Sequence, residues 1–269
     1  IAQKLKIPYV WHIRQFMEAD LGKKLFREKY VYRLVARASS VIAISKDVQA
    51  KFEPLLGRKV DLVYNGVPVE KYKLEDVIRF ESQATRMLLA GRISVQKGQM
   101  DAIKAVELLM RRGIGNVSLT LVGQGESKEY LEYVKSYVKE HKLEQKICIL
   151  EHHDDLRELR RQCDIGLTCS KKEAFGRVTV ENMLAKMLVI GANTGGTLEI
   201  VEDGYNGLLY EEGNPESLVN QIEYTMSHRD KAQQMIEQGF IQVIEDFSIK
   251  RVVDQVLNLY KLIDSRITI

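Results

Sequence analysis

Short apolar runs alternate with segments of helical periodicity along almost the whole chain, and this alternation restricts the fold more than any other feature. The apolar runs predict strands at 7–13, 41–44, 59–64, 86–91, 117–123, 146–150, 164–168, 188–192 and 207–210. The periodic segments predict helices at 23–38, 99–112, 127–141, 154–162, 178–187, 215–227, 229–239 and 248–265, and Ser45 predicts the N-cap of a further short helix. Strands joined by helices of about 10–15 residues form βαβ units, so the sequence predicts an α/β fold with parallel sheets.

The periodic pattern is lost between residues 68 and 84, which divides the chain into two lobes. We expect residues 1–75 to form half of one domain, because a compact α/β domain usually needs about 100–150 residues. Residues 76–245 are expected to form a complete second domain, and 246–269 a C-terminal helix that packs back toward the first. The chain opens with Ile1, and we expect it to be a fragment of a longer protein.

The net charge of +3 is divided unevenly along the chain. Residues 1–80 contain 16 Lys and Arg against 9 Asp and Glu, a net charge of +7, so the remainder carries −4. This split predicts two units with different partners. No apolar run approaches the roughly 18 residues that suggest a membrane span, and no signal peptide is recognisable.

The three cysteines, Cys148, Cys163 and Cys169, are too few for a disulfide framework and favour a reducing, cytoplasmic compartment. His152 and His153 lie near Cys148, yet no pair has the spacing typical of a zinc site. Buried free thiols are therefore favoured over metal ligands, and we expect no metal.

Two loops that follow predicted strands carry groups suited to phosphates. In AGRISVQKG (90–98), Arg92 and Lys97 flank the turn before a helix, whose free N–H groups add to their charge. Alone, two such residues are more often solvated surface cations. The two glycines of LVGQGE (121–126) permit close backbone approach, but the third glycine of a dinucleotide fingerprint is missing, so NAD binding is not expected.

The stretch EAFGRVTVE, which runs from Glu173 to Glu181, places one carboxylate on each side of a glycine turn. Gly176 lets the backbone approach a ligand, and the amides of Val178 and Thr179 are expected to be first-turn donors without helical acceptors. Glu173 then lies before the helix and Glu181 about one turn inside it. A carboxylate accepts two hydrogen bonds in one plane, which suits the vicinal hydroxyls of a ribose or a hexose.

Together these motifs make the sequence recognisable. SKKEAFGRVTVENMLAKMLVIGANTGGTLEIVEDGYNGLLY (170–210) closely resembles the signature of the retaining GT-B glycosyltransferases of the large group 1, or family 4, type. The two glutamates, GG-T-x-E and D-G-x-N-G occur in the family's order, AGRISVQKG resembles its phosphate loop, and VYNGV resembles its interdomain entry. The resemblance covers nearly the whole chain and implies two Rossmann-like lobes, the first (acceptor-side) lobe incomplete and the second binding the nucleotide sugar.

The resemblance also implies a role for each matching position. Glu181 would hold the ribose hydroxyls of a nucleoside diphospho-sugar, and Glu173 would contact hydroxyls of the transferred sugar. Arg92 and Lys97 would neutralise the diphosphate, and fixed cations of this kind stabilise the charge that builds on the leaving group without a metal or other cofactor. The donor site implied in this way comprises Gly91, Arg92, Lys97, Glu173, Phe175, Gly176, Val178, Thr179 and Glu181.

His12, at the end of the strand predicted at 7–13, resembles the family's histidine that reaches the donor sugar near the reacting centre. A lone histidine at a strand end is more often structural, but the resemblance favours a catalytic position for His12, beside Glu173, Arg92 and Lys97. Arg14 is a weaker candidate. Where family members usually have glycine and proline, this chain has Lys186 and Leu188; a left-handed lysine would cost about 1 kcal/mol.

The helix predicted at 23–38 is basic, which fits either a solvated face or peripheral contact with anionic lipid at the inner membrane face. Its cations are Lys23, Lys24, Arg27, Lys29, Arg33 and Arg37. Nucleic-acid binding is not expected, because few aromatic residues are interleaved with them.

We therefore expect a cytoplasmic, metal-independent, retaining hexosyltransferase that acts on a glycan or lipid-linked acceptor, as in polysaccharide, lipopolysaccharide or capsule biosynthesis. Two alternatives stay open, a nucleotide-sugar epimerase of the same fold and a non-catalytic nucleotide-sugar-binding fragment. The sequence does not distinguish UDP, GDP and ADP donors.

Overall fold

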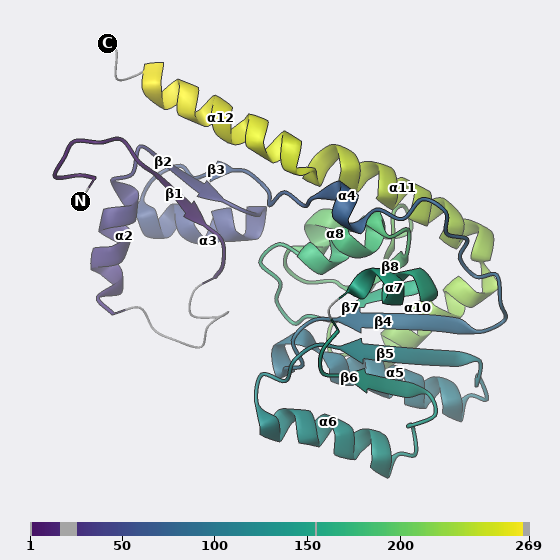
Figure 1. Cartoon of the computed structure of the whole chain (residues 1–269). Helices are drawn as coiled ribbons and strands as arrows, with labels where there is room; N and C mark the ends of the chain where they lie inside the picture. The colour runs from purple at the N-terminus through teal and green to yellow at the C-terminus, as the bar shows by residue number, and fades with distance from the viewer. Residues whose placement is uncertain (1, 17–25, 154, 266–269) are drawn as a thin grey trace. The chain divides into compact units, whose positions relative to one another are not determined.

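The computed structural model describes residues 2–16, 26–153 and 155–265, and the chain divides into two compact units. The first unit combines Ile1–Val67 with Phe247–Ile269, and the second unit is Pro68–Asp246. Figure 1 labels the helices and strands of both units. The acceptor-side and donor-side roles of the predicted domains stay predictions.

A three-stranded parallel sheet, ordered β1-β2-β3, forms the centre of the first unit. Its elements are β1 (Val10–Ile13), α2 (Glu28–Ala36), β2 (Ser40–Ala43), α3 (Lys46–Leu56), β3 (Asp61–Leu62) and α12 (Ile249–Ser265). The Ser45 hydroxyl accepts a hydrogen bond from the Val48 amide at 3.1 Å, so Ser45 caps α3 as the sequence predicts. The Val67 amide donates to the carbonyl of Phe247, two residues before α12, at 2.8 Å, which ties the end of the N-terminal segment to the C-terminal segment.

The second unit contains a six-stranded parallel sheet in the order β6-β5-β4-β7-β8-β9. Its strands are β4 (Thr85–Ala90), β5 (Val117–Val122), β6 (Ile147–Leu150), β7 (Ile165–Thr168), β8 (Leu188–Ala192) and β9 (Leu208–Tyr210). The chain runs outward from β4 to β6 and then returns to the other side of β4 with β7. The strand order reverses between β4 and β7, and ligands of open parallel sheets bind beyond the carboxyl ends of the strands at such a reversal.

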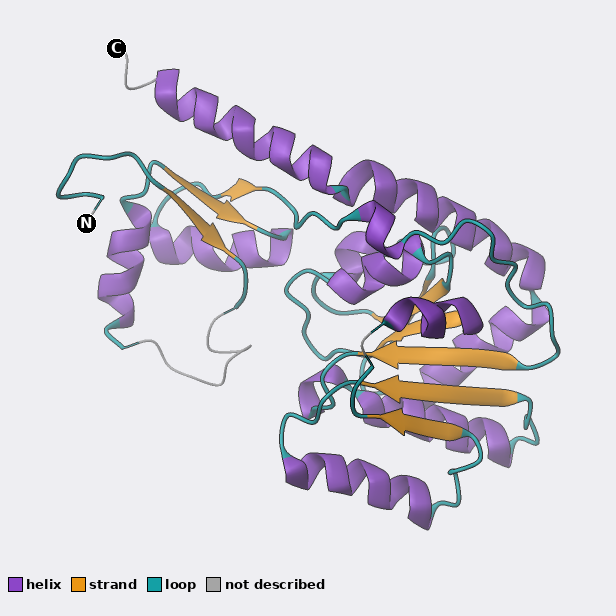
Figure 2. Cartoon of the chain, in the orientation of Figure 1, coloured by secondary structure: helices purple, strands orange, loops and turns teal. Residues whose placement is uncertain are grey.

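Helices cover both faces of this sheet, as Figure 2 shows. They are α5 (Gln99–Arg111), α6 (Lys128–Glu140), α7 (Leu156–Gln162), α8 (Arg177–Leu184), α10 (Pro215–Ser227) and α11 (Arg229–Phe247). Because successive strand residues point to opposite faces, Met87 and Leu89 join the core formed with α5, α6, α10 and α11. Leu88 and Ala90 join the opposite core, which includes Ala185 after α8.

The predicted α/β class, with parallel sheets in two lobes, is confirmed. Most element ends differ from the prediction by a few residues, although the strand predicted at 59–64 shortens to Asp61–Leu62 and α11 continues past its predicted end at 239. Three short elements lie where irregular chain was expected: α4 (Val69–Tyr72), the 3-10 turn η1 (Val95–Lys97) and α9 (Thr197–Ile200). Single turns carry no periodic pattern, which is why the sequence does not reveal them.

Candidate functional site

The loop after β4 is held in one shape by buried contacts. Gln99 is fully buried, and its side-chain amide donates to the Arg92 carbonyl at 2.8 Å and accepts from the Ser94 amide at 3.3 Å. Gly98 has a φ of 65°, and a Cβ there would lie 2.0 Å from the Cys169 carbonyl oxygen, so only glycine fits. The loop that carries Lys97 is therefore fixed against the end of β7.

The structure brings Lys97 and Glu173 together at the reversal point of the sheet. Lys97 Nζ lies 2.6 Å from Glu173 Oε2, and the Ser170 hydroxyl donates to the same oxygen at 3.1 Å. Both charged side chains are partly exposed, at 31% for Lys97 and 21% for Glu173. The predicted diphosphate cation and the predicted sugar-binding carboxylate thus lie within one hydrogen bond of each other, although their roles stay predictions.

A glycine pair supports the loop that carries Glu173. The Gly196 amide donates to the Glu173 carbonyl at 2.7 Å, and the Thr194 hydroxyl donates to the Ser170 carbonyl at 2.8 Å. A Cβ on Gly195 would lie 2.5 Å from the Glu173 carbonyl oxygen. The GG-T-x-E stretch seen in the sequence therefore positions Glu173 through the backbone.

Helix α8 begins directly after this loop. Gly176, with a φ of 93°, is its N-cap, so the amides of Val178 and Thr179 belong to the first turn, where no helical acceptor is available. Phe175 and Thr179 are buried. The predicted donor-site residues of this segment thus lie at one helix start, which favours binding of an anion or a hydroxyl oxygen.

Glu181, one turn further along α8, is buried and paired with two arginines. Its Oε2 lies 2.6 Å from Nη2 of Arg160, and its Oε1 lies 2.8 Å from Nε of Arg177. Arg177 and Glu181 are four residues apart on α8, but no local pattern in the sequence connects Arg160 with them. The residue separation of 21 between Arg160 and Glu181 is bridged only by the fold.

Arg92 is exposed, and its Nη1 lies 2.9 Å from Oε1 of Glu126, which is also exposed. Such a surface ion pair contributes about 0–1 kcal/mol. Gly91 precedes Arg92 with a φ of 146° and donates from its amide to the Val122 carbonyl at 2.9 Å. Arg92 can therefore exchange Glu126 for a more highly charged anion at small cost.

His12 and Arg14 lie in the first unit, so their predicted part in a site with Glu173 stays a prediction. His12 is the third residue of β1, and its buried Nε2 has no hydrogen-bond partner among the described residues. Burial, followed by the nearby Arg14, lowers the pKa of His12 below its usual 6.5. Both residues line a cavity of about 320 Å³, and Arg14 Nη2 donates to Asn65 Oδ1 at 3.0 Å.

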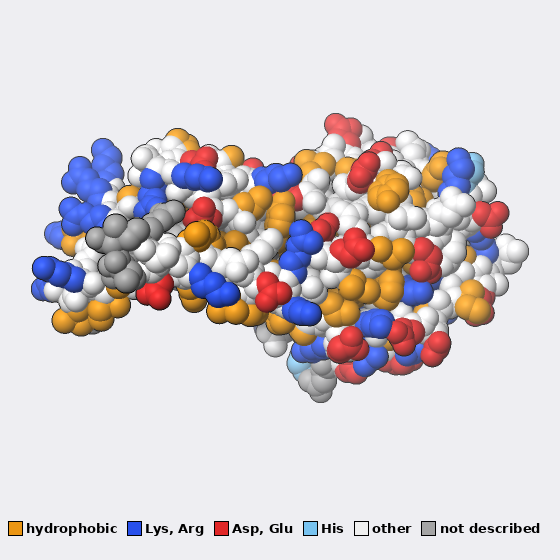
Figure 3. All heavy atoms as spheres, turned by 90° about the horizontal axis from the view of Figure 1, so that it is seen from above, with side chains coloured by type: hydrophobic (Ala, Val, Ile, Leu, Met, Phe, Trp, Pro, Cys, Tyr) orange, Lys and Arg blue, Asp and Glu red, His pale blue; other side chains and the backbone are white. Residues whose placement is uncertain are grey.

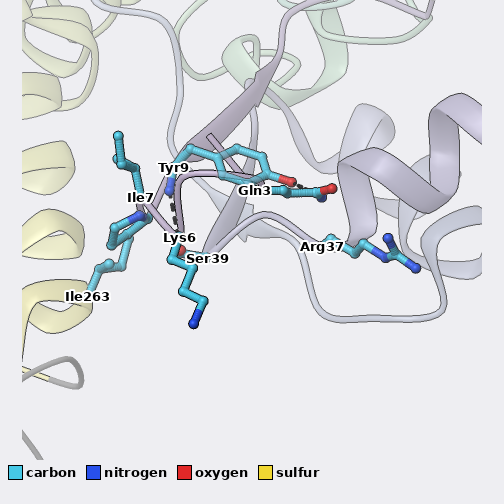
Figure 4. Close-up of a pocket in the computed structure, with 8 residues that line it drawn as sticks. Gln3, Lys6, Ile7, Tyr9, Arg37, Ser39 and Ile263 are labelled. Carbon is cyan, nitrogen blue, oxygen red and sulfur yellow. Dashed lines mark hydrogen bonds between the residues drawn. The ribbon is translucent and has the colours of Figure 1, made fainter. Parts of the chain in front are cut away.

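A second cavity of the first unit, of about 550 Å³, is lined by none of the predicted donor-site residues. Figure 4 shows its lining: Tyr9 and Gln3 are joined by a hydrogen bond, while Lys6 and Arg37 point in different directions. The two cations do not converge on one point, so this cavity is not a built anion site.

Two of the three cysteines are buried free thiols, as predicted, while Cys148 is exposed. Burial raises the pKa of Cys163 to about 11 and that of Cys169 to about 12, so both stay protonated at neutral pH. Within residues 2–16, 26–153 and 155–265, no three His, Cys, Asp or Glu side chains are grouped to hold a metal ion. Along the same described parts, no helix has the length and apolar character that crossing a bilayer requires.

The second unit matches a known family in sequence. The family profile described as Glycosyl transferases group 1 matches residues 71–242. An uncharacterized glycosyltransferase of Methanocaldococcus jannaschii is 27% identical over 243 residues, which are 89% of this chain and 64% of that protein. The N-acetyl-alpha-D-glucosaminyl L-malate synthase of Bacillus anthracis is 24% identical over 235 residues, or 84% of this chain and 60% of that enzyme.

The fold is also found among solved structures. The crystal structure of Anabaena HepE in complex with UDP and glucose superposes with a TM-score of 0.85 at 24% identity, and covers 97% of this chain and 73% of HepE. The predicted GT-B fold class is thereby confirmed. The chain spans less than two thirds of the length of the two curated relatives.

Proposed function

Because this chain belongs to the glycosyl transferases group 1 family, we propose that it transfers a hexose from a nucleoside diphospho-sugar to a glycan or lipid-linked acceptor. In this proposal the anomeric configuration is retained and no divalent metal takes part. The observation that carries it is the pairing of Lys97 with Glu173 at the point where the strand order reverses.

Each group has a distinct task in this reaction. Lys97 and Arg92 bind the diphosphate, whose negative charge grows as the bond to the sugar breaks, so the two cations stabilise the transition state more than the ground state. Glu173 accepts hydrogen bonds from hydroxyls of the hexose, and Glu181 from those of the ribose. The first-turn amides of Val178 and Thr179 add donors at the start of α8.

The ion pair between Lys97 and Glu173 supports this assignment. Lys97 Nζ and Glu173 Oε2 lie within hydrogen-bond distance of each other, at 2.6 Å. A donor would insert its phosphate beside Lys97 and its sugar beside Glu173, which satisfies both charges. A second observation in support is that HepE, which has this fold, was solved in complex with UDP and glucose.

The test is the rate of sugar transfer by Lys97→Ala and Glu173→Ala variants. Removing one such electrostatic contact typically costs about 100- to 1,000-fold in rate, and we expect a loss of that size in each variant. Lys104→Ala is the matched control, because Lys104 is an exposed cation on the neighbouring helix α5. Unchanged turnover in the first two variants contradicts the proposal.

The same samples distinguish the two alternatives. Calorimetry with UDP-, GDP- and ADP-glucose measures donor binding, and chromatography then measures the products with and without an acceptor. A non-catalytic module binds donor and releases nothing, whereas an epimerase releases nucleotide without an acceptor. Retention is read from the anomeric configuration of the product, and metal independence from activity in the presence of EDTA.

A further inference from the structure

The carboxylate of Glu181 is held between two arginines that differ in their surroundings. Arg160 is 1% exposed and Glu181 is 6% exposed, whereas 62% of the Arg177 side chain is accessible to solvent. Arg160, the buried arginine, donates to Oε2, and Arg177, the accessible one, donates to Oε1. The two oxygens of one carboxylate therefore have different partners: that of Oε2 is buried, and that of Oε1, called the open oxygen below, is mostly in solvent.

Arg160 is fixed from three directions. Its Nη2 donates to Glu181 Oε2 at 2.6 Å, and its Nε donates to Asn182 Oδ1 at 3.1 Å. Its guanidinium also lies over the Tyr72 ring, 5.4 Å from the centroid. The planar guanidinium bridges two consecutive side chains of α8, a geometry that the single ammonium of lysine does not reproduce.

Arg177 is not fixed in this way. It binds the open oxygen of Glu181 and the Tyr72 hydroxyl, at 2.8 Å each, but most of its side chain is in solvent. It lies in the same helical turn as Gly176 and the first-turn amides of α8. The partner of Oε1 therefore starts from the same turn as the amides that the proposed function assigns to donor binding.

From these contacts we propose that Arg160 is a positioning residue for ribose recognition, an inference that rests on the proposed function. Arg160 anchors Oε2, so that Oε1 can exchange the solvent-accessible Arg177 for the ribose 2′ and 3′ hydroxyls of the bound nucleoside diphosphate. A buried carboxylate that lacks this anchor loses a charged partner and its fixed orientation. Arg160 thereby makes binding selective for ribonucleoside over 2′-deoxyribonucleoside diphosphates.

The experiment measures a ratio of affinities. Calorimetry gives the dissociation constants of UDP, GDP and ADP and of their 2′-deoxy counterparts for the wild-type chain and for Arg160→Lys. A hydrogen bond to a charged group corresponds to about tenfold or more in affinity, so we expect the wild type to prefer the ribonucleotide by about that factor. In Arg160→Lys the preference is expected to fall to about threefold or less, while the affinity for inorganic pyrophosphate stays at the wild-type value.

Arg79→Lys is the matched control for loss of a buried guanidinium. Arg79 is also buried, but it donates to the carbonyl oxygens of Lys186, Arg161, Cys163 and Ala185 and does not contact Glu181. We expect Arg79→Lys to lower the thermal unfolding midpoint and to keep the ribonucleotide preference. If Arg160 had only a structural role, Arg160→Lys would also lower the thermal unfolding midpoint and keep the ribonucleotide preference.

The outcomes separate this inference from the proposed function. Arg160→Lys with the full wild-type preference overturns the role of Arg160, as does an equal loss of preference in Arg79→Lys. A wild-type chain that binds a nucleoside diphosphate without any ribose preference also overturns it, but leaves the roles of Lys97 and Glu173 standing. A wild-type chain that binds none of the three ribonucleotides overturns the proposed function itself.

Discussion

At the scale of single residues, the charged side chains of the candidate site are paired with one another. Lys97 is paired with Glu173, Arg92 with Glu126, and Glu181 with its two arginines. The first two pairs are partly or largely exposed, and such pairs contribute about 0–1 kcal/mol. In the proposed reaction, exchanging these two pairs for a doubly charged diphosphate and its sugar therefore costs little, whereas the Arg160–Glu181 pair is buried and is expected to stay in place.

His12 provides a prediction about protons. Burial and the nearby Arg14 lower its pKa in the folded chain. As the pH falls below about 6.5, His12 is protonated in the unfolded chain before it is protonated in the folded chain. The free energy of unfolding therefore decreases as the pH falls, by up to about 1.4 kcal/mol per pH unit. The decrease ends at the folded-state pKa, and His12→Gln is expected to lack this contribution.

Two measurements check the proton prediction. The NMR titration of the His12 ring is expected to give a pKa below 6.5, and urea unfolding at pH 7.5 and 5.5 is expected to show a smaller pH effect in His12→Gln than in the wild type. A titration midpoint at or above 6.5, or the same pH effect in both proteins, shows that the Nε2 environment is misjudged.

At the scale of elements, the end of α8 departs from the usual glycine. Lys186 has a φ of 52°, and its amide donates to Met183 while the Met187 amide donates to the Asn182 carbonyl. This is the Schellman pattern, in which the left-handed residue is usually glycine. Lys186, which stands where the family usually has glycine, therefore has a left-handed backbone, and this conformation costs about 1 kcal/mol.

The Lys186 side chain offsets part of this strain. Its Nζ lies 3.2 Å from Glu237 Oε1 and 4.9 Å from the centroid of the Phe240 ring, both on α11. Lys186→Met keeps the strain and loses the charge contacts, whereas Lys186→Gly loses the contacts and relieves the strain. We expect Lys186→Gly to be more stable than Lys186→Met by about 1 kcal/mol in urea unfolding. Equal stabilities show that the left-handed backbone carries no cost here.

The sequence predicts the helices and strands in which apolar residues repeat, but it does not predict the contacts between these elements. The strands and long helices of the second unit were readable because apolar residues repeat along them, and Ser45 was readable because a cap is local. The sequence predicts a site role for Glu181, but its partner Arg160 comes from α7, and only the folded sheet brings α7 and α8 together. The supporting role of Gly195 cannot be predicted from the sequence either, because it depends on a backbone contact with Glu173.

At the scale of the whole molecule, each unit has its own chemistry. The large hydrophobic core from Phe80 to Ile236 lies entirely within the second unit, which also holds Lys97, Glu173 and Glu181. The basic excess of residues 1–80 lies mainly in the first unit, and Figure 3 shows many Lys and Arg side chains on it. Lys23 and Lys24 lie outside the described residues.

The described cations of α2 form one stripe. Lys29, Arg33 and Arg37 are exposed and follow one another at intervals of four residues, so they share a helix face. Phe26 and Tyr30, which are 83% and 57% exposed, lie beside them. Cations together with exposed aromatic residues suit the surface of an anionic bilayer, and the peripheral membrane contact expected from the sequence stays a prediction for the first unit.

Sedimentation with vesicles of phosphatidylcholine and phosphatidylserine tests this contact. Each cation near an anionic surface contributes about 1 kcal/mol, so replacing Lys29, Arg33 and Arg37 with Gln is expected to weaken the partition coefficient roughly 100-fold at low salt. The control replaces three exposed lysines of the second unit, Lys104, Lys128 and Lys139, with Gln, which removes the same charge elsewhere. Because net charge is equal in the two triple variants, only a local stripe predicts that the first loses binding and the second keeps it. Equal loss in both variants would reduce the effect to overall charge, and wild-type protein that stays in the supernatant would rule the contact out.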